Sequence, residues 1–488
     1  MVSFVYYDLA FLVLFSISVA AFLYKNRKNL QVENKIILLY RTKMGLDTID
    51  YVGKKHPKIL HFLSDFVIIA GYLMMTASLL FFFAAMVLTF FAPATAKIPP
   101  IIPLVPYVDR LLPTGTLPPF YFTYWIIVIA VIAVCHEFAH GVFAKLRDIR
   151  IKSTGFGFIG PLLAAFVEID EKQMEKKPIS SQLAVLAAGS AANLMLWILF
   201  FGISAMFFTA TFAPAGVNFS SYAVGQVNLS KVVAIDNQLP DRPFKNFYEF
   251  ATVLEKLNRS SYEIMMSSGQ VYIAETKTVS TQKVALGSYS KNLNLAVLPI
   301  DSPAVRAGLT GAIQKISAGN VTYSGFEGAK DIQDALVGFG PGQNLTIETT
   351  TGRYNLTLAS HPENESRGFL GVGFNQPPKT TLGKVIGLFN YKDSSVNYIP
   401  KGGKTAGEMI IFVYHLLYWL TIINFFIMLF NMLPVGIVDG GRFFYLSALA
   451  VTKDKNKAEK WFTAVTYLML LGFLIIMGTW FVKAFFLA

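Results

Sequence analysis

The 488-residue sequence has a single cysteine and few charged residues. One cysteine, Cys135, excludes an intrachain disulfide, and a small buried side chain is a more ordinary role for it than a ligand or nucleophile. Charged residues make up 15% of the chain, hydrophobic residues make up 54%, and the mean hydropathy is +0.49. Soluble domains carry about 25% charged residues. The composition therefore excludes an ordinary soluble protein and indicates a membrane protein.

Basic residues outnumber acidic ones, and the formal net charge is +12. Such a balance could indicate a nucleic-acid partner, but the basic residues cluster beside apolar runs rather than in one tract. The clearest clusters are Lys25, Arg27 and Lys28, and Lys453, Lys455, Lys457 and Lys460. Positive residues beside membrane spans stay in the cytoplasm. We therefore expect no nucleic-acid partner and an N-terminus outside the cytoplasm. For the cytoplasmic segment up to about residue 62 we favour a solvated basic loop that touches anionic lipid over a hairpin or surface helix.

Six apolar runs are long enough to cross a bilayer as helices, because about 20 residues suffice. They cover about 4–24, 66–91, 121–143, 182–208, 409–430 and 461–485. The first is not a cleavable signal peptide, because no basic region precedes it and Asp8 comes early. The sequence thus predicts a polytopic α-helical protein of the cell membrane.

The third run contains two histidines and a glutamate, which are costly in hydrocarbon and therefore indicate function. His136 and His140 are four residues apart, so on a helix both imidazoles lie on one face and can bind one metal ion, for which zinc is the best candidate. Glu137 points about 100° round the helix, where it can take a proton from water at the metal. His136 lies about 23 Å along a span of about 30 Å, nearer the cytoplasmic side. The alternative is a chance match to this spacing.

Residues 153–167 are apolar, but this stretch is too short and too rich in glycine to span the membrane. It suits an extended re-entrant loop, whose strand edge could bind a substrate peptide through main-chain hydrogen bonds. A plain interfacial turn is the alternative.

In the fourth run, Asn193 carries a carboxamide that could bind a scissile carbonyl or join two helices.

The fifth run ends near Asn431, and Pro434 with the following glycines breaks the helix. Because this run returns to the cytoplasm, Asp439 should reach the same depth as the histidine pair. We expect it to be the third ligand, a hard oxygen that completes a His₂Asp set. The rival ligands are Glu168 and His415, but His415 should lie nearer the outer face, as a packed or hydrogen-bonded histidine.

Residues 212–402 are polar and contain alternating strand patterns, which indicates a soluble insert. A strand, a helix and a glycine turn recur after about 80 residues, which predicts two small α+β modules. Seven Asn-X-Ser/Thr sequons fall in this insert, at Asn218, Asn228, Asn258, Asn320, Asn344, Asn355 and Asn364. We therefore expect the insert to be extracytoplasmic.

Three motifs follow one another in the apolar runs: HEFAH at 136–140, Gly189-x-x-x-Asn193, and Asn431-x-x-Pro434-x-x-x-x-Asp439-Gly440. Together they resemble the site-2 protease family of intramembrane zinc metalloproteases, over about 121–210 and 405–445. The resemblance implies one zinc ion held by His136, His140 and Asp439, with Glu137 as general base. The chain departs from the family pattern at Gly436, where a second proline is frequent.

Within the insert, Ser302-Pro-Ala-Val-Arg-Ala-Gly-Leu309 and Gly368-Phe-Leu-Gly-Val-Gly-Phe374 resemble a PDZ domain of the protease-associated type. The earlier module lacks the first of these elements and resembles a degenerate PDZ. The expected order is then two transmembrane helices with their loops (1–120), the first catalytic part (121–211), two modules (212–290 and 291–376), a linker (377–404), the second catalytic part (405–445) and a last helix (446–488).

We interpret the chain as an intramembrane zinc endopeptidase that cleaves single-pass membrane proteins in or near their transmembrane segment, including substrates already cut by another protease. The modules would bind a peptide or a substrate ectodomain. A non-catalytic receptor or chaperone acting through the PDZ modules is the alternative. A metal transporter fits less well, because no chain of polar residues crosses the bilayer.

Overall fold

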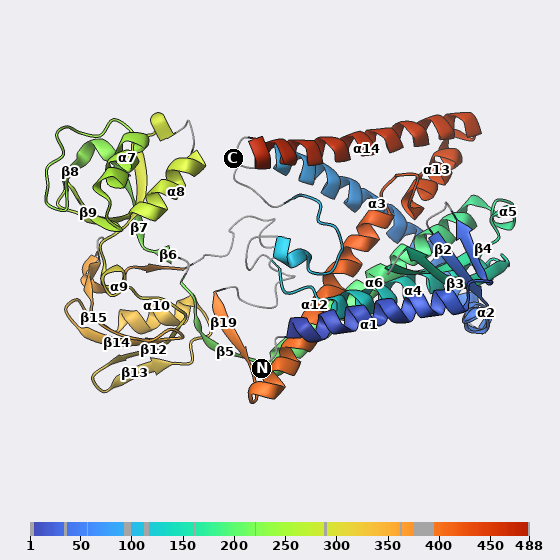
Figure 1. Ribbon diagram of the computed structural model, residues 1–488, viewed down its shortest axis with the longest axis horizontal. Helices are drawn as coiled ribbons and strands as arrows, with labels where there is room; N and C mark the ends of the chain where they lie inside the picture. The colour runs from blue at the N-terminus through green and yellow to red at the C-terminus, as the bar shows by residue number, and fades with distance from the viewer. Residues whose placement is uncertain are drawn as a thin grey trace. The chain divides into compact units, whose positions relative to one another are not determined.

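The computed structural model describes residues 4–33, 37–55, 57–91, 99–111, 117–159, 162–219, 221–286, 290–361, 364–374 and 395–486. The chain divides into two compact units, one formed by 1–207 with 411–488 and the other by 208–410 (Figure 1). Six helices among the described residues are long and apolar enough to cross a membrane. The expected number of spans is confirmed, and the protein is a polytopic membrane protein with a sheet-rich second unit.

The first unit contains the long helices and one sheet. Its helices are α1 (Phe4–Lys25), α2 (Leu46–Lys55), α3 (Pro57–Phe91), α4 (Phe122–Leu146), α5 (Glu171–Met174), α6 (Ile179–Thr211), α12 (Lys404–Asn431), α13 (Asp439–Thr452) and α14 (Lys455–Phe486), with a short 3₁₀ turn at Val108–Leu111. α3 begins earlier than the apolar run at 66–91, because its first turns, 57–65, mix apolar residues with Lys58, His61 and Asp65 and are also helical. Its 35 residues rise about 52 Å, which is more than the hydrocarbon thickness of about 30 Å.

The N-terminus of α4 is capped by a side chain from another helix. Asp8 of α1 is 1% exposed and accepts hydrogen bonds from the backbone N–H groups of Phe122 and Thr123, both at 2.8 Å. The hydroxyls of Thr123 and Tyr107 also donate to it, each at 2.5 Å. Burial and the bond to Asp8 raise the pKa of Tyr107, so its phenol remains a donor. The carboxylate thus satisfies the free N–H groups that begin α4 and ties α1 to it.

A four-stranded antiparallel sheet packs beside α4 (Figure 1). Its strands, in spatial order, are β1 (Leu30–Glu33), β2 (Ile37–Thr42), β3 (Ile151–Ile159) and β4 (Leu162–Ile169). The expected extended segment at 153–167 is therefore a hairpin, whose β4 is an edge strand among the described residues. The favoured expectation of a solvated basic loop up to residue 62 is wrong, whereas the alternative of a hairpin or a helix agrees with the β1–β2 pair and α2. The apolar run at 37–40 pairs with β3, and α2 packs on α4.

The second unit contains two hydrophobic cores. Its strands are β5 (Phe212–Val217), β6 (Ser221–Tyr222), β7 (Val224–Asn228), β8 (Val232–Ile235), β9 (Ser261–Met266), β10 (Val271–Glu275), β11 (Leu295–Pro299), β12 (Ile313–Ala318), β13 (Val321–Ser324), β14 (Asn344–Thr349), β15 (Arg353–Thr357), β16 (Ala359–His361), β17 (Asn364–Phe369), β18 (Val372–Gly373) and β19 (Val396–Pro400). Its helices are α7 (Phe247–Leu257), α8 (Thr276–Leu286), α9 (Pro303–Arg306) and α10 (Ala329–Val337), with a 3₁₀ turn at Leu229–Lys231.

The two cores share an order of elements. A strand, a helix and a hairpin recur as β8, α7 and β9–β10, and again as β12, α10 and β14–β15, with β13 added between β12 and α10 in the second series. The first core includes residues from Val227 to Leu298, whereas the second joins Val217 to residues between 304 and 396. β5 and β19 pair antiparallel, with Phe212 opposite Pro400, so the two ends of the insert lie next to each other.

Candidate metal centre

The first part of the centre is the inward face of α4, which carries His136 and His140 one turn apart, 8% and 7% exposed. Both rings pack directly against the backbone of α6 at Gly189. A Cβ at this glycine would lie 2.3 Å from His140 Nε2 and 2.6 Å from His136 Nε2. No side chain fits in that space, so glycine is required for the two helices to bring the imidazoles together.

The second part of the centre comes from the turn between α12 and α13. α12 ends at Asn431, and Pro434 cannot continue it because proline has no N–H to donate. The chain turns through bonds from Val435 N to the Leu433 carbonyl and from Val438 N to the Val435 carbonyl, both internal to the turn. α13 then starts at Asp439. Gly436, where the family frequently has a second proline, lies within this turn. Its presence does not prevent Asp439 from beginning α13.

The three side chains converge on one point. His136 Nε2 and His140 Nε2 each lie 3.2 Å from Asp439 Oδ2, and they are 3.1 Å from each other. Donors about 2.05 Å from a zinc ion in a tetrahedron are about 3.3 Å apart. Two imidazoles and a carboxylate with that spacing fit zinc and leave a fourth position open. Within the described part of the chain, no other group of three His, Cys, Asp or Glu side chains is close enough to hold an ion.

Each histidine also has a partner for its other ring nitrogen. His140 Nδ1 lies 2.7 Å from the Val185 carbonyl, and His136 Nδ1 lies 3.0 Å from the Asn193 carboxamide. A carbonyl oxygen only accepts, so His140 carries its proton on Nδ1 and presents Nε2 as the metal donor. Such partners fix the ring orientation of metal-binding histidines.

Glu137 lies beside the three candidate ligands without belonging to their group. Its Oε2 accepts a hydrogen bond from the Val167 N–H of β4 at 3.0 Å. It lines the same cavity of about 960 Å³ as the three candidate ligands, together with most of β4. The cavity therefore combines a potential metal site, a carboxylate and a strand edge.

The other residues considered as ligands do not join this group. Glu168 accepts a hydrogen bond from Ser153 Oγ at 2.7 Å and pairs with Arg41 at 3.1 Å. His415 lies in α12, with its ring edge-on to Tyr124 at 6.3 Å. Cys135 is partly buried next to His136 but is not part of the cluster.

Two contributions to the centre, the Val185 carbonyl and the Val167 N–H, could not be predicted from the sequence, because main-chain groups leave no signal in the amino-acid pattern. Gly189 belongs to the Gly189-x-x-x-Asn193 motif, but its contact with both imidazoles is known only from the packing of the helices.

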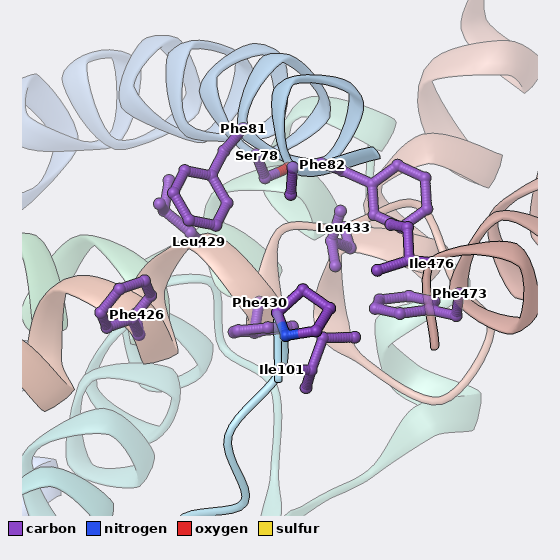
Figure 2. Close-up of a pocket in the computed structure, with 12 residues that line it drawn as sticks. Ser78, Phe81, Phe82, Ile101, Phe426, Leu429, Phe430, Leu433, Phe473 and Ile476 are labelled. Carbon is purple, nitrogen blue, oxygen red and sulfur yellow. The ribbon is translucent and has the colours of Figure 1, made fainter. Parts of the chain in front are cut away.

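A separate small cavity, of about 40 Å³, lies between α3, α12 and α14 (Figure 2). Phenylalanine rings from all three helices line it, including Phe82, Phe426 and Phe473. Among the described residues of its lining, Ser78 is the one polar side chain, and the Ser78 hydroxyl already donates to the Met75 carbonyl. The described part of this lining thus contains no titratable side chain, unlike that of the metal centre.

Comparison with known proteins gives two findings. The family model for peptidase family M50 matches residues 124–473, which include all the residues of the centre. An uncharacterized protein of Methanocaldococcus jannaschii is 28% identical over 289 residues, which cover 55% of this chain and 70% of that protein.

Proposed function

The chain belongs to peptidase family M50, the site-2 protease family, and from this premise we propose that it is an intramembrane zinc endopeptidase. Its substrates are single-pass membrane proteins, cut in or near the transmembrane segment. The observation that carries the proposal is the convergence of His136, His140 and Asp439, with ligand atoms 3.1–3.2 Å apart, in a cavity shared with Glu137. The six apolar helices support a multi-pass membrane location, which we take to be the cell membrane.

The roles of the residues follow from their positions. A bound zinc ion would polarise the scissile carbonyl and make water a nucleophile near neutral pH. Glu137 takes the proton from the attacking water and passes it to the leaving amine. The Val167 N–H holds one oxygen of this carboxylate, which fixes the direction in which it faces. His136, His140 and Asp439 would hold one such ion per chain.

We assign Asn193 to orienting His136 rather than to binding the substrate carbonyl. Asn193 is 0% exposed, and it does not belong to the lining of the metal cavity. When His136 uses Nε2 for the metal, its Nδ1 carries a proton and needs an acceptor. The carboxamide oxygen and nitrogen of asparagine can exchange places, and the hydrogen-bond network decides which one faces a partner. A protonated His136 Nδ1 therefore selects the orientation in which the Asn193 oxygen faces it. This makes Asn193 a positioning residue.

The edge of β4 offers the substrate a main-chain partner. Val167 directs its N–H away from β3 to Glu137, so every second residue, Ala165 and Leu163, directs its main-chain groups the same way. Leu163 and Ala165 line the metal cavity. A helix hides its carbonyls in internal hydrogen bonds, so the substrate must unwind before it is cut. An unwound segment that pairs with Leu163 and Ala165 presents an extended peptide beside the metal centre.

The insert is proposed to be a pair of PDZ-like modules outside the cytoplasm. Its two cores repeat one order of elements, and Gly371, within the Gly368–Phe374 motif, has a positive φ of 86°. We propose that the modules bind substrate ectodomains or peptides and admit substrates that another protease has already trimmed. The position of the insert between α6 and α12, the helices that hold Asn193 and lead to Asp439, motivates this role.

The proposal is tested with the purified full chain in detergent and a single-pass model substrate. The wild-type protein should contain zinc and cut the substrate, a chelator should stop cleavage, and added zinc should restore it. Glu137→Gln should keep its zinc and lose at least about 100-fold in turnover, since general base catalysis contributes about that much or more. Wild-type turnover in Glu137→Gln would exclude Glu137 as the base.

A further inference from the structure

A second cavity, of about 180 Å³, adjoins Glu137 and is lined by apolar side chains from four elements. We call it the side pocket and define it by Ile49 of α2, Val134 and Phe138 of α4, Phe156 of β3 and Phe166 of β4. We propose that the side pocket binds the apolar side chain of a substrate residue that directly flanks the scissile bond. This inference rests on the proposed function, because it concerns the specificity of the same site.

The side pocket and the metal cavity meet at the residues that bear on the reaction. Glu137 and residues 165–167 line both of them. A substrate strand paired with the edge of β4 directs successive side chains to opposite faces. Glu137 lines both cavities, so in the proposed pose a side chain directed to the metal cavity there has its neighbour directed to the side pocket. The occupant of the side pocket is therefore a residue next to the reacting peptide bond.

The chemistry of the lining selects an apolar side chain. Its two threonine hydroxyls are already engaged locally: Thr154 Oγ1 donates to the Met44 carbonyl at 2.7 Å, and Thr42 Oγ1 accepts from Met44 N at 3.1 Å. The Glu137 carboxylate is held by the Val167 N–H. A polar substrate side chain would lose its water and find no unengaged side-chain partner among the described residues of the lining.

The volume selects a large side chain. A cavity of about 150 Å³ lined by Leu, Ile and Phe holds a benzene molecule. The side pocket, at about 180 Å³, therefore accommodates a leucine, methionine or phenylalanine side chain, whereas alanine would leave most of it empty. Val134 is 52% exposed, so a lipid acyl chain is the competing occupant.

The experiment uses the purified full chain and a single-pass model substrate whose cut is located by mass spectrometry. The residues on each side of the cut are then changed in turn to leucine, phenylalanine, alanine and aspartate. At one of the two positions, kcat/KM for leucine and phenylalanine should exceed that for alanine by at least about tenfold, since one methylene in an apolar pocket gives about 10- to 200-fold. Aspartate should be cut more slowly than alanine.

A second experiment fills the side pocket with a larger side chain of the protein itself. Val134→Phe should reduce the ratio of leucine to alanine kcat/KM toward one. The matched control is Ala130→Phe, which adds the same ring one turn away on the exposed face of α4, outside the side pocket, and should leave the ratio unchanged. Thermal unfolding of both variants shows that each is folded.

Two outcomes overturn the inference alone: cleavage without discrimination at either flanking residue, or a Val134→Phe effect equal for all substrates. The second of these would assign the side pocket to an acyl chain. A wild-type protein that binds zinc but cuts no substrate would overturn the proposed function, and the inference with it.

Discussion

At the scale of single residues, the glycine at 189 is the tightest constraint on the metal centre. A methyl group there would overlap both imidazoles, so Gly189→Ala should displace them and lower the affinity for zinc about 10- to 100-fold. Gly202→Ala is the matched control, because it lies on the same helix and its added Cβ would meet no atom within 4 Å. Zinc titration with a competing chelator measures both. Equal affinity in the two variants would contradict the packing described at Gly189.

Asn193 provides a test that separates two roles. If it orients His136, Asn193→Ala should weaken zinc binding about 10- to 100-fold, as is usual when the partner of a metal-binding histidine is removed. Asn193→Asp, which keeps an acceptor oxygen, should recover part of the affinity. Chelator competition measures the affinity, and single-turnover cleavage measures the chemical step. Unchanged zinc affinity with slower cleavage would instead favour contact with the substrate carbonyl.

The sequence predicts the three candidate ligands of the metal centre, but not the main-chain groups that support them. His136 and His140 follow from helical spacing in an apolar run, and Asp439 follows from a turn that returns to the same depth, supported by the family resemblance. The partners at Val185 and Val167 could not be predicted, because any residue supplies the same main-chain group.

At the scale of elements, α4 depends on a cap from α1. Asp8→Ala would leave two backbone N–H groups and two hydroxyls without this acceptor in a buried place, which should lower the free energy of unfolding by about 3 kcal/mol. Asp8→Asn keeps one oxygen and should cost less. Thermal unfolding in detergent compares the three proteins. An Asp8→Ala protein as stable as the wild type would show that the cap contributes nothing.

The long apolar helices were predictable, whereas the sheet beside α4 was predictable only in part. Length and hydropathy define a membrane span without reference to its neighbours, but a strand needs a partner. The segment at 153–167 was expected to be extended because its glycines and short length exclude a span. Its pairing with 37–42 joins segments more than a hundred residues apart, and the basic residues around that strand favoured a loop.

At the scale of the whole molecule, the chain enters and leaves the insert at neighbouring points. β5 and β19 bring Phe212 opposite Pro400, and Lys401 N donates to the Thr211 carbonyl, so a short Gly/Ser linker can replace 212–400. The shortened protein should keep one zinc ion per chain. It should also cut an untrimmed substrate at a rate closer to that of a trimmed one, measured on a matched pair of substrates. Loss of zinc would show that the insert supports the metal centre.

The division into a polytopic core and a polar insert was predictable because composition changes sharply near residues 212 and 402. The sequence predicts that the insert contains two modules, because a strand, a helix and a turn recur, but it does not predict which segments form each core. Val217, from the start of the insert, packs in the second core, since β5 pairs with β12 and β19. Pairing between strands so distant in the chain leaves no local pattern.

The central claim is that three side chains from α4 and the start of α13 hold one zinc ion. The most direct test is zinc content per chain, measured by metal analysis on purified, folded wild-type, Glu137→Gln and Asp439→Ala proteins. The account predicts one zinc ion in the first two and a large loss in Asp439→Ala. A folded wild-type protein without zinc, or full zinc in Asp439→Ala, would contradict it.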